Sequence, residues 1–492
     1  MEGASHSHSQ QGSGRNRGEN NMSHESARSE SHIRNLFERA ALTDRARQSW
    51  TLFDLGDQGF ATVILGVILP IYYSDVAGGS AVGWSYTIAL SFAIIAVLSP
   101  VLGALADYLE RSRTFLGVFT VMGITSTAAI FFMGEGEIPL LWFAIPLPSW
   151  GLPLPVPSEL LALSFLVILA NIGYSGARLF YNSLLPGITT DETIDRVSAA
   201  GFAAGYLGGT VILIVAIVLT VAPSAFGIPD VATASRLALF VAACWWAVFV
   251  IPLFIYVPEP ERADEDKPTG NPVTSAFGRL YTTFQEIRVF QVAFVFLVAY
   301  WFYINGVNAI ILLAAAYGTE IGISQNNVML AFLLVQILGV PFALLFGQLA
   351  DRIETKNAIY CGLGVYILIS FLAVGITEAW HFFAMAFLVG MVQGGTQAIS
   401  RSLFGSLIPT HKSGEFFSFY TIVTGFASIA APLLFGIVGD VTGSDRLAIA
   451  SVSVFFIIGT ALLTRVDVEK GRRAAREATV EGERATEDVT PV

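Results

Sequence analysis

The chain has 492 residues, of which 54% are hydrophobic and 13% are charged, and its formal net charge is −11. A soluble globular protein carries about 25% charged residues, so this composition excludes an ordinary soluble enzyme or binding domain. The apolar residues are gathered in runs of about 20, the length of helix that crosses a hydrocarbon core about 30 Å thick. We therefore expect an all-α, polytopic membrane protein.

The two ends of the chain differ in composition from its apolar middle. Residues 1–46 are rich in Ser, His, Gly, Asn and Arg and are expected to form a disordered cytoplasmic tail, without the apolar segment of a signal peptide. Residues 466–492 form an acidic cytoplasmic tail, for which the same lack of apolar surface predicts no fold of its own.

Apolar runs separated by charged or Pro/Gly-rich breaks predict twelve membrane-spanning helices. Their approximate limits are 50–73, 84–106, 113–133, 159–182, 196–222, 235–257, 288–316, 326–350, 356–376, 380–404, 415–439 and 446–464. A cytoplasmic linker at 258–285, which contains the charged stretch PEPERADEDKPTGNP, separates two six-helix bundles at 47–257 and 286–465.

Positive charge is distributed unevenly over the predicted loops. Arg and Lys, including Arg111, Arg113 and Lys356, occur mainly in the even-numbered connections and in the tails, whereas the odd-numbered connections are dominated by acids. The positive-inside rule then places both termini in the cytoplasm, and we expect a multi-pass protein of the cell membrane.

Two short motifs occur once in each half. RLFYNSLLP begins at Arg178 and RSLFGSLIP at Arg401, 223 positions apart, while GALADYLERSR begins at Gly103 and GQLADRIETKN at Gly347, 244 positions apart. The difference of 21 residues is explained by an enlarged outer loop at 138–159, IPLLWFAIPLPSWGLPLPVPSE. Two homologous halves with the same membrane orientation are typical of secondary transporters whose substrate site lies between the halves.

The loop motifs also resemble those of a known family. Gly-x-x-x-Asp between the second and third helices, ending in Asp107 and again in Asp351, resembles the loop signature of the major facilitator superfamily. The second copy continues with Arg352, as in that family, whereas the first has Tyr108 at the equivalent position. The resemblance implies the major facilitator fold and a gating role for Asp107, Asp351 and Arg352.

Longer segments narrow the resemblance to one branch of that superfamily. LFDLGDQGFATVI, LFYNSLLPGI, GFAAGYLGG and GGTQAISRSLFGSLIP…GEFFSFY resemble the vacuole effluxer-like branch, whose fungal members export amino acids from the vacuole. In the first helix the family pattern Tyr-Asp-Trp-Ala-Asn-Ser keeps its aspartate, Asp54, and loses its Trp and Asn. An amino-acid substrate is what this resemblance implies.

Independently of the resemblance, polar residues recur at helical spacing on one face of the first, fourth, seventh and tenth helices. We expect them to line the substrate pathway: Asp54, Asp57, Gln58, Asn171, Tyr174, Tyr181, Asn182, Asn305, Asn308, Gln393 and Gln397. The alternative for each residue taken singly is a hydrogen bond that joins two helices, worth about 1 kcal/mol or less.

The repeated arginines lie near the cytoplasmic ends of their helices. We expect Arg178 to pair with Asp54 and Arg401 to pair with Glu415, so that the two pairs open and close the inner mouth. The alternative is a purely structural arginine that pairs with a neighbouring acid.

The motifs of several other function classes are missing from the sequence. It has no nucleotide-binding glycine-rich loop, no catalytic constellation and no pattern for a metal, a cofactor or nucleic acid, so we expect neither an ATP-driven pump nor an enzyme. The predicted function is secondary active transport of a small polar solute by alternating access, with a proton or Na⁺ as candidate coupling ion. The alternatives are a permease for a sugar, a drug or an organic anion, and a non-transporting receptor or scaffold built on a transporter fold.

Overall fold

The structure is a computed structural model that describes residue 38 and residues 42–109, 111–133, 158–190, 193–259, 272–409 and 413–487, and this part of the chain contains helices and no strand. The first membrane segment consists of α2 (Arg45–Gly59), the π-helical η1 (Phe60–Ile68), α3 (Leu69–Ile71) and the π-helical η2 (Tyr72–Val76). It is followed by α4 (Ala81–Leu109), α5 (Ser112–Ile130), α6 (Ser158–Ile188), α7 (Ile194–Val221) and α8 (Val231–Tyr256).

The second half has the same order of long helices. It begins with α9 (Pro272–Val289), α10 (Gln291–Glu320), α11 (Gln325–Ile353), α12 (Thr355–Leu372) and α13 (Ala379–Ser406). It ends with α14 (Ser413–Phe426), α15 (Ala430–Thr442), α16 (Asp445–Ser451), α17 (Ser453–Leu463) and α18 (Val468–Glu487). Helices suit a bilayer because they pair their backbone polar groups without help from water.

The expected polytopic, all-α architecture is confirmed. In the part of the chain that the structure describes, eleven helices are long and apolar enough to cross a membrane. The remaining expected span coincides with α11, whose apolar part covers Gln325–Gly339. The eleventh span is interrupted between α14 and α15, and the twelfth is interrupted at Val452, between α16 and α17.

Two segments outside the expected spans contain helices. The linker at 258–285 ends in α9, whose Ile287 is buried and whose Phe284 packs beside Phe294 of α10, with ring centroids 5.8 Å apart. Residues 260–271, which carry most of the charge of the linker, lie outside the described part of the chain.

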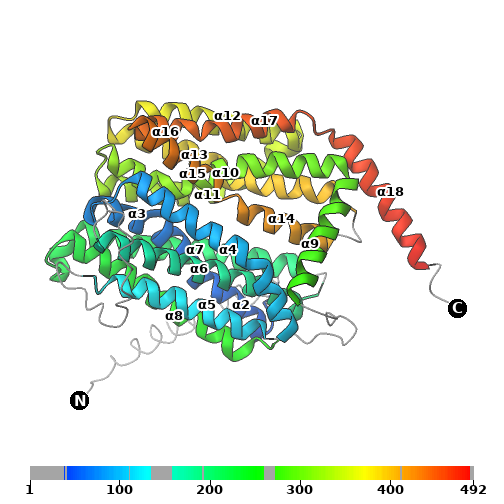
Figure 1. The fold of residues 1–492 in the computed structure, drawn as a ribbon, viewed down its shortest axis with the longest axis horizontal. Coiled ribbons are helices and arrows are strands. Elements are labelled where there is room, and N and C mark those ends of the chain that lie inside the picture. Colours follow the sequence, from blue (N-terminus) through cyan, green and yellow to red (C-terminus); the bar gives the residue numbers. More distant parts are fainter. Residues whose placement is uncertain are drawn as a thin grey trace, which may run out of the picture.

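The acidic tail differs from our expectation of a segment without a fold of its own. Residues 468–487 form α18, which extends beyond the bundle in Figure 1. Asp467 caps its first turn by accepting the backbone N–H of Lys470 at 3.0 Å, and Ala, Arg and Glu are strong helix formers. A lack of apolar surface argued against a packed domain, but it does not prevent a single helix whose first turns pack on the bundle at Gly471 and Ala475.

Two other expectations fall on residues outside the described ranges. The N-terminal tail up to residue 41 is described at residue 38 alone, and the enlarged loop at 138–159 is described at 158 and 159 alone.

The helices form two packed groups that run side by side (Figure 1). Helices α2 to α8 pack on one another, and so do α10 to α17. In Figure 1, α9 and α18 lie at one end of the bundle, which we call the α9 end, while α3 and α16 lie at the opposite end, the α3 end. Between the groups, α4 packs along α15 and α7 packs along α11.

Hydrogen bonds between described residues of the two halves lie toward the α3 end. The indole Nε1 of Trp84 donates to the carbonyl oxygen of Leu312 at 2.8 Å, and the hydroxyl of Tyr86 donates to Asp440 Oδ2 at 2.6 Å. In the same region, a Cβ on Gly439 would overlap the side chain of Val82, so α15 and α4 approach closely. The halves are therefore joined and closed at the α3 end.

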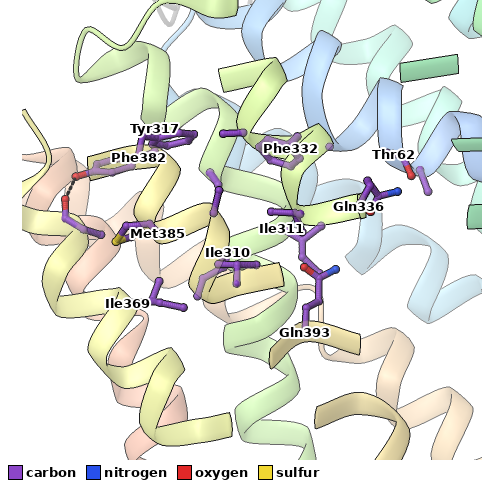
Figure 2. Close-up of a pocket in the computed structure, with 18 of the residues that line it drawn as sticks. Thr62, Ile310, Ile311, Tyr317, Phe332, Gln336, Ile369, Phe382, Met385 and Gln393 are labelled. Atoms are coloured by element: carbon purple, nitrogen blue, oxygen red, sulfur yellow. Dashed lines mark hydrogen bonds between the residues drawn. The ribbon is translucent and has the colours of Figure 1, made fainter. Parts of the chain in front are cut away.

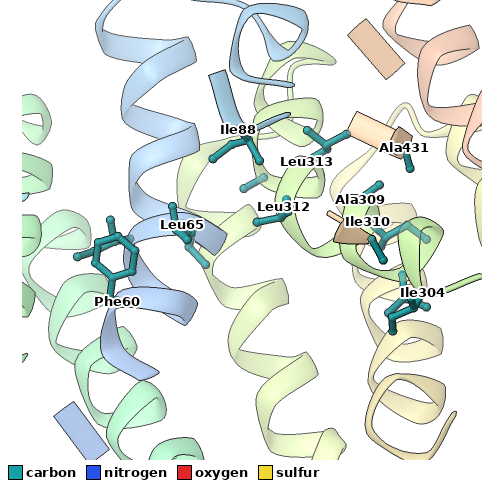
Figure 3. Packing of buried hydrophobic residues seen from close by; sticks show 14 of the residues in the cluster. Phe60, Leu65, Ile88, Ile304, Ala309, Ile310, Leu312, Leu313 and Ala431 are labelled. Atoms are coloured by element: carbon teal, nitrogen blue, oxygen red, sulfur yellow. The ribbon is translucent and has the colours of Figure 1, made fainter. Parts of the chain in front are cut away.

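Apolar side chains continue this contact toward the middle of the bundle. Figure 3 shows Leu65 of η1 and Ile88 of α4 pointing toward Leu312 and Leu313 of α10, and Leu65 and Ile88 are 3% and 0% exposed. Because lipid tails are as apolar as leucine, such contacts stabilise a membrane protein through close packing more than through removal from water.

The repeated loop motif performs the same structural task in both halves. At the start of α5, the backbone N–H of Arg113 donates to Glu259 Oε1 at 2.9 Å, and its guanidinium donates to the carbonyl oxygen of Phe254 near the end of α8. At the start of α12, Lys356 Nζ donates to the carbonyl oxygen of Val466 at 2.7 Å, just after α17. A basic side chain thus binds a carbonyl at the end of the sixth helix of each half, where the helix dipole favours a cation.

The glycines of GFAAGYLGG in α7 pack against α2 of the same half. A Cβ on Gly201 would lie 2.5 Å from Asp54 Oδ2, and one on Gly208 would overlap the carbonyl oxygen of Leu55. Bare backbone at these positions lets α7 approach the helix that carries the acidic pair. The glycine seam is a contact inside the N-terminal half.

We predict that Gly208→Ala lowers the stability of the detergent-solubilised protein by about 1–3 kcal/mol, because the new methyl group has no room. The matched control is Gly364→Ala in α12, where a Cβ would meet no heavy atom within 4 Å. Thermal unfolding, monitored by size-exclusion chromatography, should show a lower transition temperature than the wild type for Gly208→Ala and an unchanged one for Gly364→Ala. Equal behaviour of the two variants would contradict this packing.

Candidate functional site

One arginine of α6 contacts two acids of α2. Arg178 Nη1 lies 3.4 Å from Asp54 Oδ1, and its shortest contact is with Asp57 Oδ2. The exposed fractions of the side chains are 22% for Arg178, 5% for Asp54 and 0% for Asp57. The expected contact between Arg178 and Asp54 is present, and Asp57 is the nearer partner.

Aromatic rings surround this charge network. Tyr181, one turn after Arg178, donates its hydroxyl to Asp54 Oδ2 at 2.7 Å and is stacked between Trp50 and Phe53, with both centroid distances 4.3 Å. Tyr174, one turn before Arg178, has its ring centroid 5.8 Å from the guanidinium carbon. Tyr174 thus lies beside the guanidinium, and Tyr181 holds Asp54, one of its two acidic partners.

The network has one carboxylate more than it has cations. Asp57 Oδ1 is buried and has no hydrogen-bond partner among the described residues. A buried charge without a partner is costly, so a group that neutralises or binds this oxygen would stabilise the network. A proton is the smallest species that does so.

A cavity of about 310 Å³ lies between the two halves. Of the residues that we expected along the pathway, Gln58, Gln393 and Gln397 line it. The other lining residues come from η1, α7 and the C-terminal half: Ala61, Thr62, Gly66, Phe202, Tyr206, Ile310, Ile311, Ala314, Tyr317, Ala331, Phe332, Val335, Gln336, Ile369, Ser370, Ala373, Ile376, Phe382, Met385, Ala386, Val389 and Ile449.

The cavity has a polar side and an apolar side. Figure 2 shows Thr62 beside Gln336, whereas Phe382, Met385 and Ile369 gather on the side away from them. The lining residues include no Asp, Glu, Lys, Arg or His. The site therefore offers hydrogen bonds from amides and hydroxyls together with an apolar wall.

Three asparagines expected along the pathway form hydrogen bonds within the bundle and are not among the residues that line this cavity. Asn171 donates to Ser91 Oγ of α4 at 2.7 Å, and Asn308 donates to Ser428 Oγ at 3.0 Å, in the non-helical segment between α14 and α15. Asn305 donates to its own helix at the carbonyl oxygen of Trp301, at 2.8 Å. Helical spacing predicts which residues share a face, but it does not say whether that face meets a cavity or a neighbouring helix.

The remaining expected residues are not on the cavity wall either. Asp54, Asp57, Tyr174 and Tyr181 belong to the charge network next to Gln58, and Asn182 is exposed near the end of α6. Conversely, Tyr206 and Gln336 line the cavity and were missed. Gln336 is a lone amide in an apolar run. Because polar groups are costly in a bilayer, this amide could have been predicted to face a cavity or another helix.

The expected gating residues have different surroundings. Arg401 places its guanidinium carbon 6.0 Å from the ring centroid of Phe202, across the boundary between the halves. The side chains of its expected partner Glu415 and of Asp107 lie outside the described part of the structure, so their contacts stay predictions. Asp351 and Arg352 are exposed at the end of α11 and form no ion pair within the described residues.

We predict that Arg178→Gln destabilises the protein by about 3–5 kcal/mol, because it leaves two buried acids without their cation. Asp57→Asn should cost much less, since it leaves one acid for one arginine. Thermal unfolding in detergent measures both effects. A larger loss for Asp57→Asn than for Arg178→Gln would show that the network is not held by its cation.

Comparison with known proteins relates these features to characterised chains. Residues 84–476 match the family model described as "Vacuole effluxer Atg22 like". The chain is 34% identical over 433 residues to the uncharacterized MFS-type transporter YxiO of Bacillus subtilis (strain 168), which covers 86% of this chain and 95% of that protein. Autophagy-related protein 22 of Yarrowia lipolytica (strain CLIB 122 / E 150) is 27% identical over 308 residues, which is 57% of this chain and 51% of the fungal protein.

Solved structures of transporters share the fold. A bacterial homolog of the human lysosomal transporter Spinster, in an inward-facing and unoccupied conformation, matches with a TM-score of 0.62 and 12% identity over 88% of this chain and 97% of that chain. A D-xylose-proton symporter matches with a TM-score of 0.60 and 14% identity, over 86% of this chain and 97% of the symporter. At these identities the likeness concerns the fold alone.

Proposed function

The chain belongs to the Atg22-like vacuole effluxer family of the major facilitator superfamily, and we propose that it moves amino acids with apolar side chains across a membrane by alternating access. The observation that carries the proposal is the cavity between the halves, with amides and hydroxyls on one side and an apolar wall on the other. A glutamine amide both accepts from an ammonium group and donates to a carboxylate, so one residue type serves both ends of a zwitterion.

The apolar wall favours an amino acid over a sugar. A sugar carries hydroxyl groups around its ring, and those facing Ile369, Phe382 and Met385 would lose their hydrogen bonds to water without replacement. An aliphatic or aromatic side chain has no such cost there. The likeness to a xylose symporter concerns the fold and does not alter this argument.

The contacts between the halves support alternating access. The bonds of Trp84 to Leu312 and of Tyr86 to Asp440 close the α3 end, and a carrier has to break them when it opens there. We propose that the α9 end faces the cytoplasm of a cell-membrane protein, because Arg113 and Lys356 lie at that end.

Counterflow in proteoliposomes tests this function. Vesicles loaded with unlabelled leucine, methionine or phenylalanine should take up the labelled amino acid well above the rate of protein-free vesicles, whereas glucose-loaded vesicles should not take up labelled glucose. Gln393→Ala should reduce the exchange, because it removes an amide from the cavity wall. If folded protein exchanges none of these three amino acids, the proposed carrier of amino acids with apolar side chains is excluded, and a permease for other solutes or a non-transporting scaffold remains.

We further propose that the Arg178 network carries the coupling proton. Two acids face one arginine, and Asp57 Oδ1 has no hydrogen-bond partner among the described residues. A proton on Asp57 would give the network one charge of each sign while the substrate is bound. Release of that proton on the opposite side of the membrane would then link the movement of the proton to the movement of the substrate.

This coupling predicts separate effects on exchange and on accumulation. Asp57→Asn should keep counterflow at a rate near that of the wild type and should lose uptake driven by a pH gradient, because the amide is fixed in the neutral form. Accumulation that persists in Asp57→Asn would remove this acid from coupling. Wild-type accumulation driven by a Na⁺ gradient, without a pH gradient, would instead assign the coupling to Na⁺.

A further inference from the structure

The two repeated arginines differ in how their charge is neutralised. Arg178 contacts Asp54 and Asp57 within its own half. Arg401, at the equivalent position of the second half, is exposed and forms no ion pair within the part of the chain that the structure describes. A guanidinium carries five donors and stays charged at all physiological pH values, so Arg401 has donors available for an anion.

Arg401 lies at the edge of the substrate cavity. On α13, Gln393, Gln397 and Arg401 follow one another at intervals of four residues and so share a face, and the two glutamines line the cavity. Four residues correspond to about 6 Å along the helix axis, so Arg401 lies one turn beyond Gln397 toward the α9 end. Phe202, whose ring Arg401 faces at 6.0 Å, also lines the cavity, from the other half.

The contact of Arg401 with Phe202 does not occupy the guanidinium strongly. A cation over an aromatic ring at an exposed position contributes about 0.5–1 kcal/mol. A carboxylate that receives two parallel N–H donors from the guanidinium binds more strongly and in a defined orientation. An incoming carboxylate can therefore replace the ring as the partner of Arg401.

We propose that Arg401 binds the carboxylate of the substrate at the α9 end of the cavity and so selects solutes that carry this group. The inference rests on the proposed amino-acid transport and adds the residue that recognises the acid. The wall of the cavity supplies no cation of its own among its lining residues, so Arg401 provides the charge that the glutamines lack. The ammonium group then faces the amide oxygens, and the side chain faces the apolar wall.

Competition by a substrate and by its amide tests the inference. Labelled leucine counterflow is measured in proteoliposomes with increasing unlabelled leucine or leucinamide, which lacks the carboxylate. The wild type should prefer leucine over leucinamide by about 10- to 100-fold, the range for hydrogen bonds to a charged group. Arg401→Gln should weaken inhibition by leucine by about the same factor and leave inhibition by leucinamide nearly unchanged. Arg401→Lys should restore part of the preference.

The matched control is Arg476→Gln, which removes an exposed arginine of α18 that does not line the cavity. It should keep the wild-type preference, and all variants are checked for folding by size-exclusion chromatography and thermal unfolding. An unchanged preference in Arg401→Gln, or an equal loss for leucine and leucinamide, would overturn the inference while the transport function stands. Wild-type protein that exchanges no amino acid would overturn both.

Discussion

The contact of Arg178 with Asp54 and Asp57 is the interaction on which the arrangement of the N-terminal half depends. It joins α6 to α2 inside the membrane region, where an unpaired charge would be costly. The glycines of α7 pack on the same stretch of α2, so three helices meet around the charge network. Gln58 follows Asp57 directly, and the network therefore also fixes where the first amide of the cavity wall lies.

The sequence repeats, but the two halves do not carry the same chemistry. Each half has an arginine in the same local sequence, and each uses a basic side chain to bind a carbonyl at the end of its sixth helix. The N-terminal arginine is enclosed by acids and aromatic rings, whereas Arg401 is exposed beside the cavity and faces Phe202 of the other half. We interpret this asymmetry as a division of labour, in which one half holds the coupling charge and the other contacts the substrate.

Sequence patterns predicted the helices well and the site in part. Apolar runs locate spans reliably because the bilayer sets their length, and GFAAGYLGG indicated a close helix contact, although not which helix. Composition alone missed α18, since it does not weigh helix propensity against exposure. Spacing could not separate Gln397, which lines the cavity, from Asn171, which bonds to Ser91, because the direction of a polar face depends on how helices pack.

The central claim is that the cavity is reached alternately from both sides of the membrane. The sequence has two cysteines, Cys244 and Cys361, so a variant with both replaced by Ser provides a clean background for Ala314→Cys in the cavity wall. Reaction of this cysteine with a membrane-impermeant maleimide is measured from each side of oriented vesicles. The account predicts reaction from both sides, with substrate reducing the rate from each. Reaction from one side alone, unchanged by substrate under all conditions, would contradict it.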